Sequence, residues 1–238
     1  APSFGAASLS PPVVVADVDG DGLDDLFLPW GRRAKVYFTG ESLGERSLEL
    51  RLPLDLDPRD EPGKDVGPRR ELSDAWFRDF DGDGKLDLLT HHWAIDGGWF
   101  GATAELSFYA GTGAGFAAPV TMETSRAAVD VRILDYDSDG DLDLLVPQVD
   151  TGFANLGRAL VSQEVRIEVE LYEMRDGRFV ALPLPLRTLE FPLDDEDPLH
   201  AEFEADLNGD GLIDLVTNDR KQKVVVYAGT PKSVSEEP

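Results

Sequence analysis

The sequence predicts an all-β fold: a β-propeller built from four repeats of about sixty residues, each a roughly four-stranded antiparallel blade. Three observations carry this prediction. An aspartate-rich motif occurs four times, and short apolar runs flank each copy at matching places. In addition, no ten-residue window combines a helical period with capping residues.

The aspartate motif has the form D-x-[DN]-x-D-G-x-x-D and occupies residues 17–25, 79–87, 135–143 and 206–214. Its first residues are separated by 62, 56 and 71 positions, so 53, 47 and 62 residues lie between consecutive copies. These stretches are too short to hold a further blade that lacks the motif. We therefore expect four blades in a single domain over residues 1–238.

Strands are predicted from short runs rich in Val, Ile, Leu, Phe and Tyr, bounded by Gly and Asp. The runs directly before the motifs are 13–18, 75–80, 129–136 and 201–207, and those directly after are 26–28, 88–90, 144–146 and 215–217. Third strands are expected at 34–38, 105–109, 165–172 and 223–227, and fourth strands at 48–52, 116–122 and 179–184.

Carboxylates at alternate positions of a nine-residue loop converge only around a cation that offsets their repulsion. Calcium fits, because it takes six to eight oxygen ligands at ~2.3–2.6 Å, whereas magnesium keeps several waters and rarely uses an all-protein cage. An EF-hand also begins D-x-D-x-D-G but requires a glutamate at position 12. That position holds Leu28, Thr90, Val146 and Thr217, which excludes an EF-hand. A plain acidic turn would explain one copy but not four in one register.

The motif, its period and its strand context resemble the FG-GAP or VCBS-type repeat, as in the propeller of integrin α-subunits and many bacterial surface proteins. The resemblance implies one calcium ion per loop, between the first two strands of each blade. It also implies ligands at positions 1, 3, 5, 7 (through the carbonyl oxygen) and 9. These are Asp17, Asp19, Asp21, Leu23 and Asp25; Asp79, Asp81, Asp83, Lys85 and Asp87; Asp135, Asp137, Asp139, Asp141 and Asp143; and Asp206, Asn208, Asp210, Leu212 and Asp214. The integrin propeller has seven blades, so this chain either closes as a four-bladed ring or is a portion of a larger assembly.

Composition excludes several classes of protein. The net charge of −25 argues against nucleic acid and anionic membrane surfaces as partners. The absence of cysteine removes thiol catalysis, thiolate metal sites and disulfides. No apolar run approaches the ~20 residues that cross a bilayer. Residues 1–5 lack the features of a signal peptide, so we expect an extracellular or cell-surface protein whose signal segment has been removed.

Other chemistries find little support. With only three histidines, a Ser-His-Asp triad has little support. His91 and His92 are neighbours in a strand and point to opposite faces, so they do not chelate one transition metal unless the loop twists. With 47 acidic residues, carboxylate pairs carry no signal for a glycosidase. The aromatic residues Trp30, Trp93, Trp99 and Phe100 could form a sugar-stacking platform or fill the core between blades.

A ligand-binding face is predicted from strand parity. In an up-and-down blade, the aspartate motifs share one face, and the long connectors 55–74, 91–104, 147–163 and 188–200 share the other. The second face collects aromatic and basic residues, which are the usual anchors of interfaces. They are Trp30, Arg32, Arg33, Arg69, Arg70, Trp93, Trp99, Arg158, Arg220 and Lys221.

The expected function is a secreted or cell-surface, calcium-stabilised binding or adhesion module for a protein or carbohydrate ligand. About four structural calcium ions are expected, with no nucleic acid partner, no direct membrane insertion and no catalytic constellation. The alternative is a calcium-dependent, polysaccharide-acting enzyme, lyase-like, on a propeller scaffold.

Overall fold

In the computed structural model, the described residues are 13–40, 46–56, 69–95, 102–124, 127–128, 131–149, 157, 161, 164–192, 203–205, 207–209, 214–218 and 224–227. Within these residues, no helix is long and apolar enough to cross a membrane.

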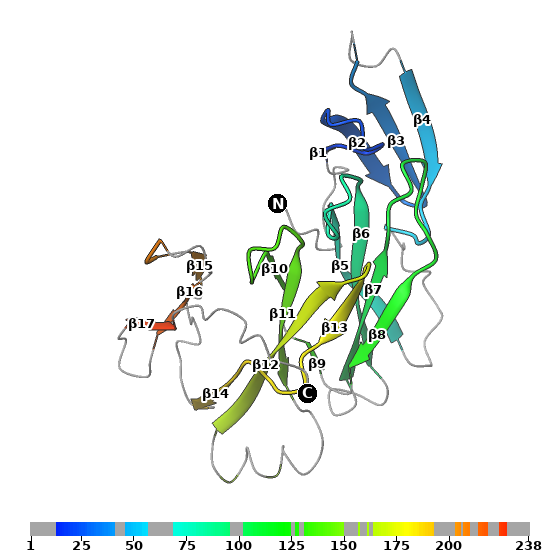
Figure 1. Ribbon diagram of the computed structural model, residues 1–238. Coiled ribbons are helices and arrows are strands. Elements are labelled where there is room, and N and C mark those ends of the chain that lie inside the picture. Colours follow the sequence, from blue (N-terminus) through cyan, green and yellow to red (C-terminus); the bar gives the residue numbers. More distant parts are fainter. Residues whose placement is uncertain are drawn as a thin grey trace, which may run out of the picture.

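The described strands form antiparallel sheets that follow one another along the chain, one sheet per repeat (Figure 1). Sheet 1 consists of β1 (Val14–Ala16), β2 (Asp25–Trp30), β3 (Arg33–Phe38) and β4 (Arg46–Arg51). Sheet 2 consists of β5 (Arg69–Arg78), β6 (Asp87–Ile95), β7 (Ala102–Tyr109) and β8 (Val120–Thr124). Sheet 3 consists of β9 (Ala127–Ala128), β10 (Arg132–Leu134), β11 (Asp143–Val149), β12 (Glu164–Arg175), β13 (Arg178–Ala181) and β14 (Arg187–Pro192). Sheet 4 consists of β15 (Phe203–Ala205), β16 (Asp214–Asn218) and β17 (Val224–Tyr227).

The all-β, antiparallel architecture is thus confirmed, and sheets 1 and 2 have the expected four strands. Each aspartate motif lies between two successive antiparallel strands of its sheet. A regularity that the apolar runs did not reveal links the four sheets. The leucine at position 10, directly after each motif, pairs with a tyrosine on the next strand of the same sheet, which is β3, β7, β12 or β17. The pairs are Leu26–Tyr37, Leu88–Tyr109, Leu144–Tyr172 and Leu215–Tyr227.

Sheet 3 departs from a simple four-stranded blade. Its long strand β12 pairs through residues 172–175 with β13 and through residues 164–169 with β14. Between β13 and β14 lie Pro183 and Pro185, which have no backbone N–H to donate to the ladder. The predicted connector 188–200 is therefore wrong in its first part, because Arg187–Pro192 form a strand.

Strands β5 and β6 are also longer than predicted. Residues 69–74 and 91–95, expected in connectors, pair with each other in a ladder with a bulge between Leu72 and Asp74. The prediction followed apolar runs, but antiparallel pairing uses backbone groups, which polar residues such as His91 and His92 also supply.

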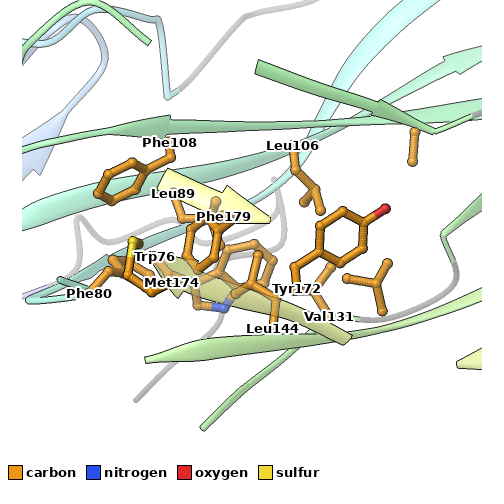
Figure 2. Packing of buried hydrophobic residues seen from close by; sticks show 12 residues of the cluster. Trp76, Phe80, Leu89, Leu106, Phe108, Val131, Leu144, Tyr172, Met174 and Phe179 are labelled. Carbon is orange, nitrogen blue, oxygen red and sulfur yellow. The ribbon is translucent and has the colours of Figure 1, made fainter. Parts of the chain in front are cut away.

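The core lies between successive sheets. One cluster joins sheets 1 and 2 through residues such as Phe27, Val36 and Leu88. A second joins sheets 2 and 3, and a third covers the other face of sheet 3. At the sheet 2–sheet 3 interface, Phe179 packs edge-on against Phe80 and Phe108, with ring centroids 5.9 and 5.4 Å away (Figure 2). Such contacts favour one relative placement of the two sheets.

Replacing Phe179 by alanine should lower the free energy of unfolding by about 3–5 kcal/mol, because it removes the sheet 3 partner of both rings. Leu184→Ala is the control, since Leu184 is largely exposed and should change the stability by less than about 0.5 kcal/mol. Chemical denaturation measures both. Equal effects of the two substitutions would contradict this account of the interface.

Candidate metal centres

In each of the first three repeats, the aspartates at positions 1, 3 and 9 of the motif come together. One carboxylate oxygen from each of the three lies within 4.8 Å of the others. The three groups are Asp17, Asp19 and Asp25; Asp79, Asp81 and Asp87; and Asp135, Asp137 and Asp143. Three negative charges this close are stable only when neutralised by protons or a cation.

The position 1 aspartate closes the loop. Asp17 accepts hydrogen bonds from the N–H groups of Gly20, Asp21 and Gly22 at 2.7–3.2 Å. Gly84 donates to Asp79, and Gly140 to Asp135, in the same way. The glycine at position 6 has a φ of +85°, +82° and +98° in the first, second and third loops, a backbone conformation that residues with a side chain rarely adopt.

The position 9 aspartate ties the loop to the sheet. In all four repeats its Oδ2 accepts the N–H of position 2, at 2.8–3.2 Å. In the first three repeats its Oδ1 also accepts an N–H at 2.6–2.9 Å, donated by Thr39 just beyond β3, by Gly111 just beyond β7 or by Met174 near the end of β12. All four of these aspartates are buried. One side chain therefore joins three separate segments of each of these three repeats.

The three N–H donors were missed by sequence reasoning, because Thr, Gly and Met share no side-chain property. A signal does exist: each donor lies two residues after the tyrosine of the Leu–Tyr pair.

The position 5 aspartates, predicted as ligands, lie outside the three carboxylate groups. Asp21, Asp83 and Asp139 instead accept the N–H of position 7, at 2.9–3.0 Å. In the fourth motif, Asp206, Asp210 and Leu212 lie outside the described residues. Asn208 and Asp214 are described, and Leu207 donates its N–H to Asp214.

Burial raises the pKa of the position 9 carboxyls. For Asp87 the pKa rises to about 7 and for Asp143 to about 6, mainly through desolvation and with a smaller contribution from neighbouring carboxylates. Hydrogen bonds from backbone N–H groups oppose the rise. The pKa values of Asp25 and Asp79 are raised by the same main cause.

Calcium fits these groups. Two ligands on opposite sides of a Ca²⁺ ion lie about 5 Å apart, close to the observed spread of the oxygens. Oδ1 of Asp19 and Oδ1 of Asp79 are buried and accept no hydrogen bond among the described residues. A buried carboxylate oxygen without a donor is costly, and a bound cation would supply the missing partner.

Loops of adjacent sheets touch one another. A Cβ on Gly20 would lie 3.3 Å from Cγ of Lys85, and a Cβ on Gly82 would lie 2.6 Å from Oδ1 of Asp141. The N–H of Leu142 donates to the carbonyl oxygen of Phe80 at 2.8 Å. In both cases position 4 of one loop meets position 7 of the next. The candidate centres of sheets 1, 2 and 3 are therefore packed in a row.

Three residues of the predicted ligand face have described side chains. Trp30, Arg32 and Arg33 lie at the β2–β3 turn, at the end of the strands remote from the aspartate motif. Both arginines are exposed and already paired, Arg32 with Asp55 at 3.2 Å and Arg33 with Glu49 at 2.7 Å. Arg69, Arg70 and Trp93 lie on β5 and β6, again at the ends remote from the motif. The remaining predicted residues, Trp99, Arg158, Arg220 and Lys221, lie outside the described residues.

Comparison with known families assigns part of the chain. Residues 79–146 match the family model of the FG-GAP-like repeat. This segment is an FG-GAP-like repeat. It begins at position 1 of the second aspartate motif and ends three residues after the third, so the predicted resemblance is confirmed over this unit.

Outside this FG-GAP-like repeat the comparisons give less. No curated protein matches the chain. Among solved structures, the exotype rhamnogalacturonan lyase YesX is similar with a TM-score of 0.40 and 13% identity, over 95% of this chain and 44% of that one. The chain thus spans less than half the length of that enzyme.

The raised pKa values predict a pH dependence in the presence of chelator. Folded Asp87 and Asp143 keep their protons up to about pH 7 and about pH 6, whereas unfolded aspartates ionise near ~4. Between these values the unfolded chain binds fewer protons, so the free energy of unfolding should fall as the pH rises from about 4 to about 7. Bound calcium favours the ionised form and should flatten this dependence. Melting curves between about pH 5 and pH 8 in chelator would contradict the prediction if the melting temperature stayed level or rose.

Gly111 should not tolerate a side chain. A Cβ there would lie 2.4 Å from the carbonyl oxygen of Leu86 and 3.2 Å from Oδ1 of Asp87. Gly111→Ala should therefore cost about 1–3 kcal/mol of stability by forcing the loop and the third strand apart. At Gly40 a Cβ meets nothing within 4 Å, so Gly40→Ala serves as the matched control. Similar unfolding free energies for the two variants would contradict the proposed closeness of loop and strand.

Proposed function

We propose that this protein is a calcium-stabilised β-propeller module that binds a protein or carbohydrate ligand outside the cell. The observation that carries the proposal is the convergence of three aspartates in each of the first three repeats, with one carboxylate oxygen from each within 4.8 Å of the others. The FG-GAP-like repeat at residues 79–146 supports it. In this proposal the fourth motif takes a calcium ion as well.

The proposed role of calcium is structural. Each loop joins two strands, and its position 9 carboxylate accepts backbone N–H groups that fix the loop on its sheet. An ion would let that carboxylate stay ionised, which strengthens both hydrogen bonds. Because neighbouring loops touch, filling one centre should also order the next.

An extracellular setting suits the proposed sites. Calcium modules of extracellular proteins bind with dissociation constants of ~10⁻⁴–10⁻³ M, which calcium outside the cell can fill. The net charge of −25 makes nucleic acid an unsuitable partner.

The proposed ligand surface is the end of the strands remote from the aspartate motifs. In sheet 1 this end presents Trp30, an exposed aromatic side chain, beside the ion-paired Arg32 and Arg33. Aromatic and arginine side chains at a rigid turn are common binding anchors. We propose binding rather than turnover as the activity of this surface.

Removing calcium should lower the melting temperature, and Ca²⁺ should restore it better than Mg²⁺ because the loops offer a flexible oxygen shell. A site filled at a hundredfold excess over its dissociation constant adds ~2.7 kcal/mol. Asp79→Ala should reduce this calcium-dependent gain, since it removes a position 1 ligand. Glu49→Gln removes one acidic charge outside the loops and should keep the full gain. An unchanged melting temperature after complete removal of metal would contradict structural calcium.

A screen of glycans and proteins, with calcium and with chelator, tests the ligand. A captured ligand should lose affinity about tenfold or more with Trp30→Ala and should be unaffected by Val120→Ala, which changes an exposed residue on β8. A bound polysaccharide that is cleaved during the assay would favour the enzymatic alternative over binding alone.

A further inference from the structure

The position 3 aspartate is held differently in the first and second loops. In the second loop, Oδ1 of Asp81 accepts the N–H of Asp83 at 3.3 Å, so the backbone of the loop itself orients this carboxylate. In the first loop, Oδ1 of Asp19 is buried and accepts no hydrogen bond among the described residues. The described N–H groups of the first loop donate to its other aspartates. The orientation of Asp19 therefore depends on a contact from outside its loop.

An arginine of the outer strand makes this contact. The guanidinium of Arg46, the first residue of β4, forms an ion pair with Oδ2 of Asp19 at 2.9 Å. The side chain of Asp19 is only 12% exposed, so one partner of the pair is largely removed from water. Salt screens such a pair less than a pair between two exposed groups.

Arg46 is itself held by an aromatic ring. Its guanidinium carbon lies 3.9 Å from the centroid of the Phe38 ring, and a guanidinium is attracted to the face of such a ring. Phe38 is buried at the end of β3, directly opposite Arg46 in the ladder. The next residue, Thr39, donates its N–H to Asp25. The end of β3 thus supports two aspartates of the first centre, Asp25 directly and Asp19 through Arg46.

Sheet 2 limits the movement of the backbone at Asp19. A Cβ on Gly113 would lie 3.4 Å from the carbonyl oxygen of Asp19 and 3.5 Å from its Cα. Gly113 belongs to a turn of sheet 2 in which the N–H of Thr112 donates to the carbonyl oxygen of Gly115. The backbone of Asp19 is therefore packed against sheet 2, while its carboxylate is held by Arg46.

Sheet 3 has a different residue at the place of Arg46. In sheet 1, Arg46 lies opposite the residue that follows the tyrosine of the Leu–Tyr pair. In sheet 3 that following residue is Glu173, and the residue opposite it on β13 is Val180. Valine carries no charge, so this contact distinguishes the first repeat from the third.

We infer that Arg46 is a positioning residue of the first metal centre, which holds Oδ2 of Asp19 and leaves Oδ1 available to the cation. The inference rests on the calcium sites of the proposed function and deepens that proposal. A guanidinium near the centre also repels a cation, and this effect acts in the opposite direction. Orientation outweighs repulsion here, because the side chain of Arg46 is 66% exposed and water screens its charge.

The coupling between Arg46 and the cation is reciprocal. If Arg46 raises the calcium affinity of the first centre, bound calcium strengthens the hold on Arg46 by the same factor. Arg46 begins β4, which pairs within sheet 1 only with β3. The backbone hydrogen bonds of such an outer strand open more readily than those of a central strand. Calcium in the first centre should therefore slow hydrogen exchange in β4.

Calorimetric titration with calcium, after removal of metal from the full chain, tests the inference. Arg46→Met removes the charge and keeps a flexible side chain against the Phe38 ring. One site should lose calcium affinity about tenfold or more, and the other sites should be unchanged. Arg46→Lys keeps a cation opposite Asp19 and should lose less. Arg51→Met makes the same change at an exposed arginine at the other end of β4 and should leave every site unchanged.

Hydrogen exchange gives a second readout. In the wild type, calcium should slow exchange of the β4 amides, and in Arg46→Met this slowing should be lost. Calcium should still slow exchange in β6, which follows the second loop, in both proteins. A purely structural role of Arg46 would instead speed exchange in β4 equally with calcium and with chelator.

The outcomes separate the inference from the proposed function. The inference alone is overturned if the wild type binds calcium and Arg46→Met leaves its affinity unchanged or raises it, since a rise would mean that repulsion dominates. It is also overturned if calcium still slows exchange in β4 of Arg46→Met. A wild-type chain that binds no calcium overturns the proposed function and the inference together.

Discussion

The architecture depends on a buried carboxylate that belongs to both a loop and a sheet. In sheet 2 this is Asp87, which accepts the N–H of Phe80 within its own loop and the N–H of Gly111 beyond β7. The hydrogen bond from Gly111 is lost if the loop moves away from the sheet. The same side chain lines the candidate metal centre, so a cation bound there would act on the carboxylate that holds the loop to the sheet.

Much of this arrangement could be predicted from the sequence, because the residue types and the spacing of the motif indicate the chemistry of the loop. Aspartates at fixed intervals and a glycine that permits positive φ can be read without coordinates. The sequence does not show which backbone groups form hydrogen bonds. The N–H groups of Thr39, Gly111 and Met174 do equivalent work from unrelated residues, and β14 pairs despite standing beyond two prolines. Such backbone contributions cannot be predicted from the pattern of side chains.

The stack of sheets 1, 2 and 3 is continuous at two levels. Large apolar side chains fill the space between the sheets, and at the edge of the same interfaces the aspartate loops touch through positions 4 and 7. Glycine at position 4 is what allows this approach at Gly82, where a Cβ would lie 2.6 Å from Asp141. Packing of the sheets and order in the loops are therefore parts of one cooperative structure, in which a disturbance of either reaches the other.

The interrupted outer edge of sheet 3 has a consequence for solubility. A long, regular edge strand is a template on which other chains can add strands and aggregate. Pro183 and Pro185 divide that edge into β13 and β14 and remove two N–H donors from it, so an incoming strand finds no unbroken ladder. Sheet 1 protects its outer edge differently, with the charged residues Arg46, Glu49 and Arg51 along β4. A protein made of repeated sheets thus limits edge-to-edge polymerisation while keeping its faces free to pack.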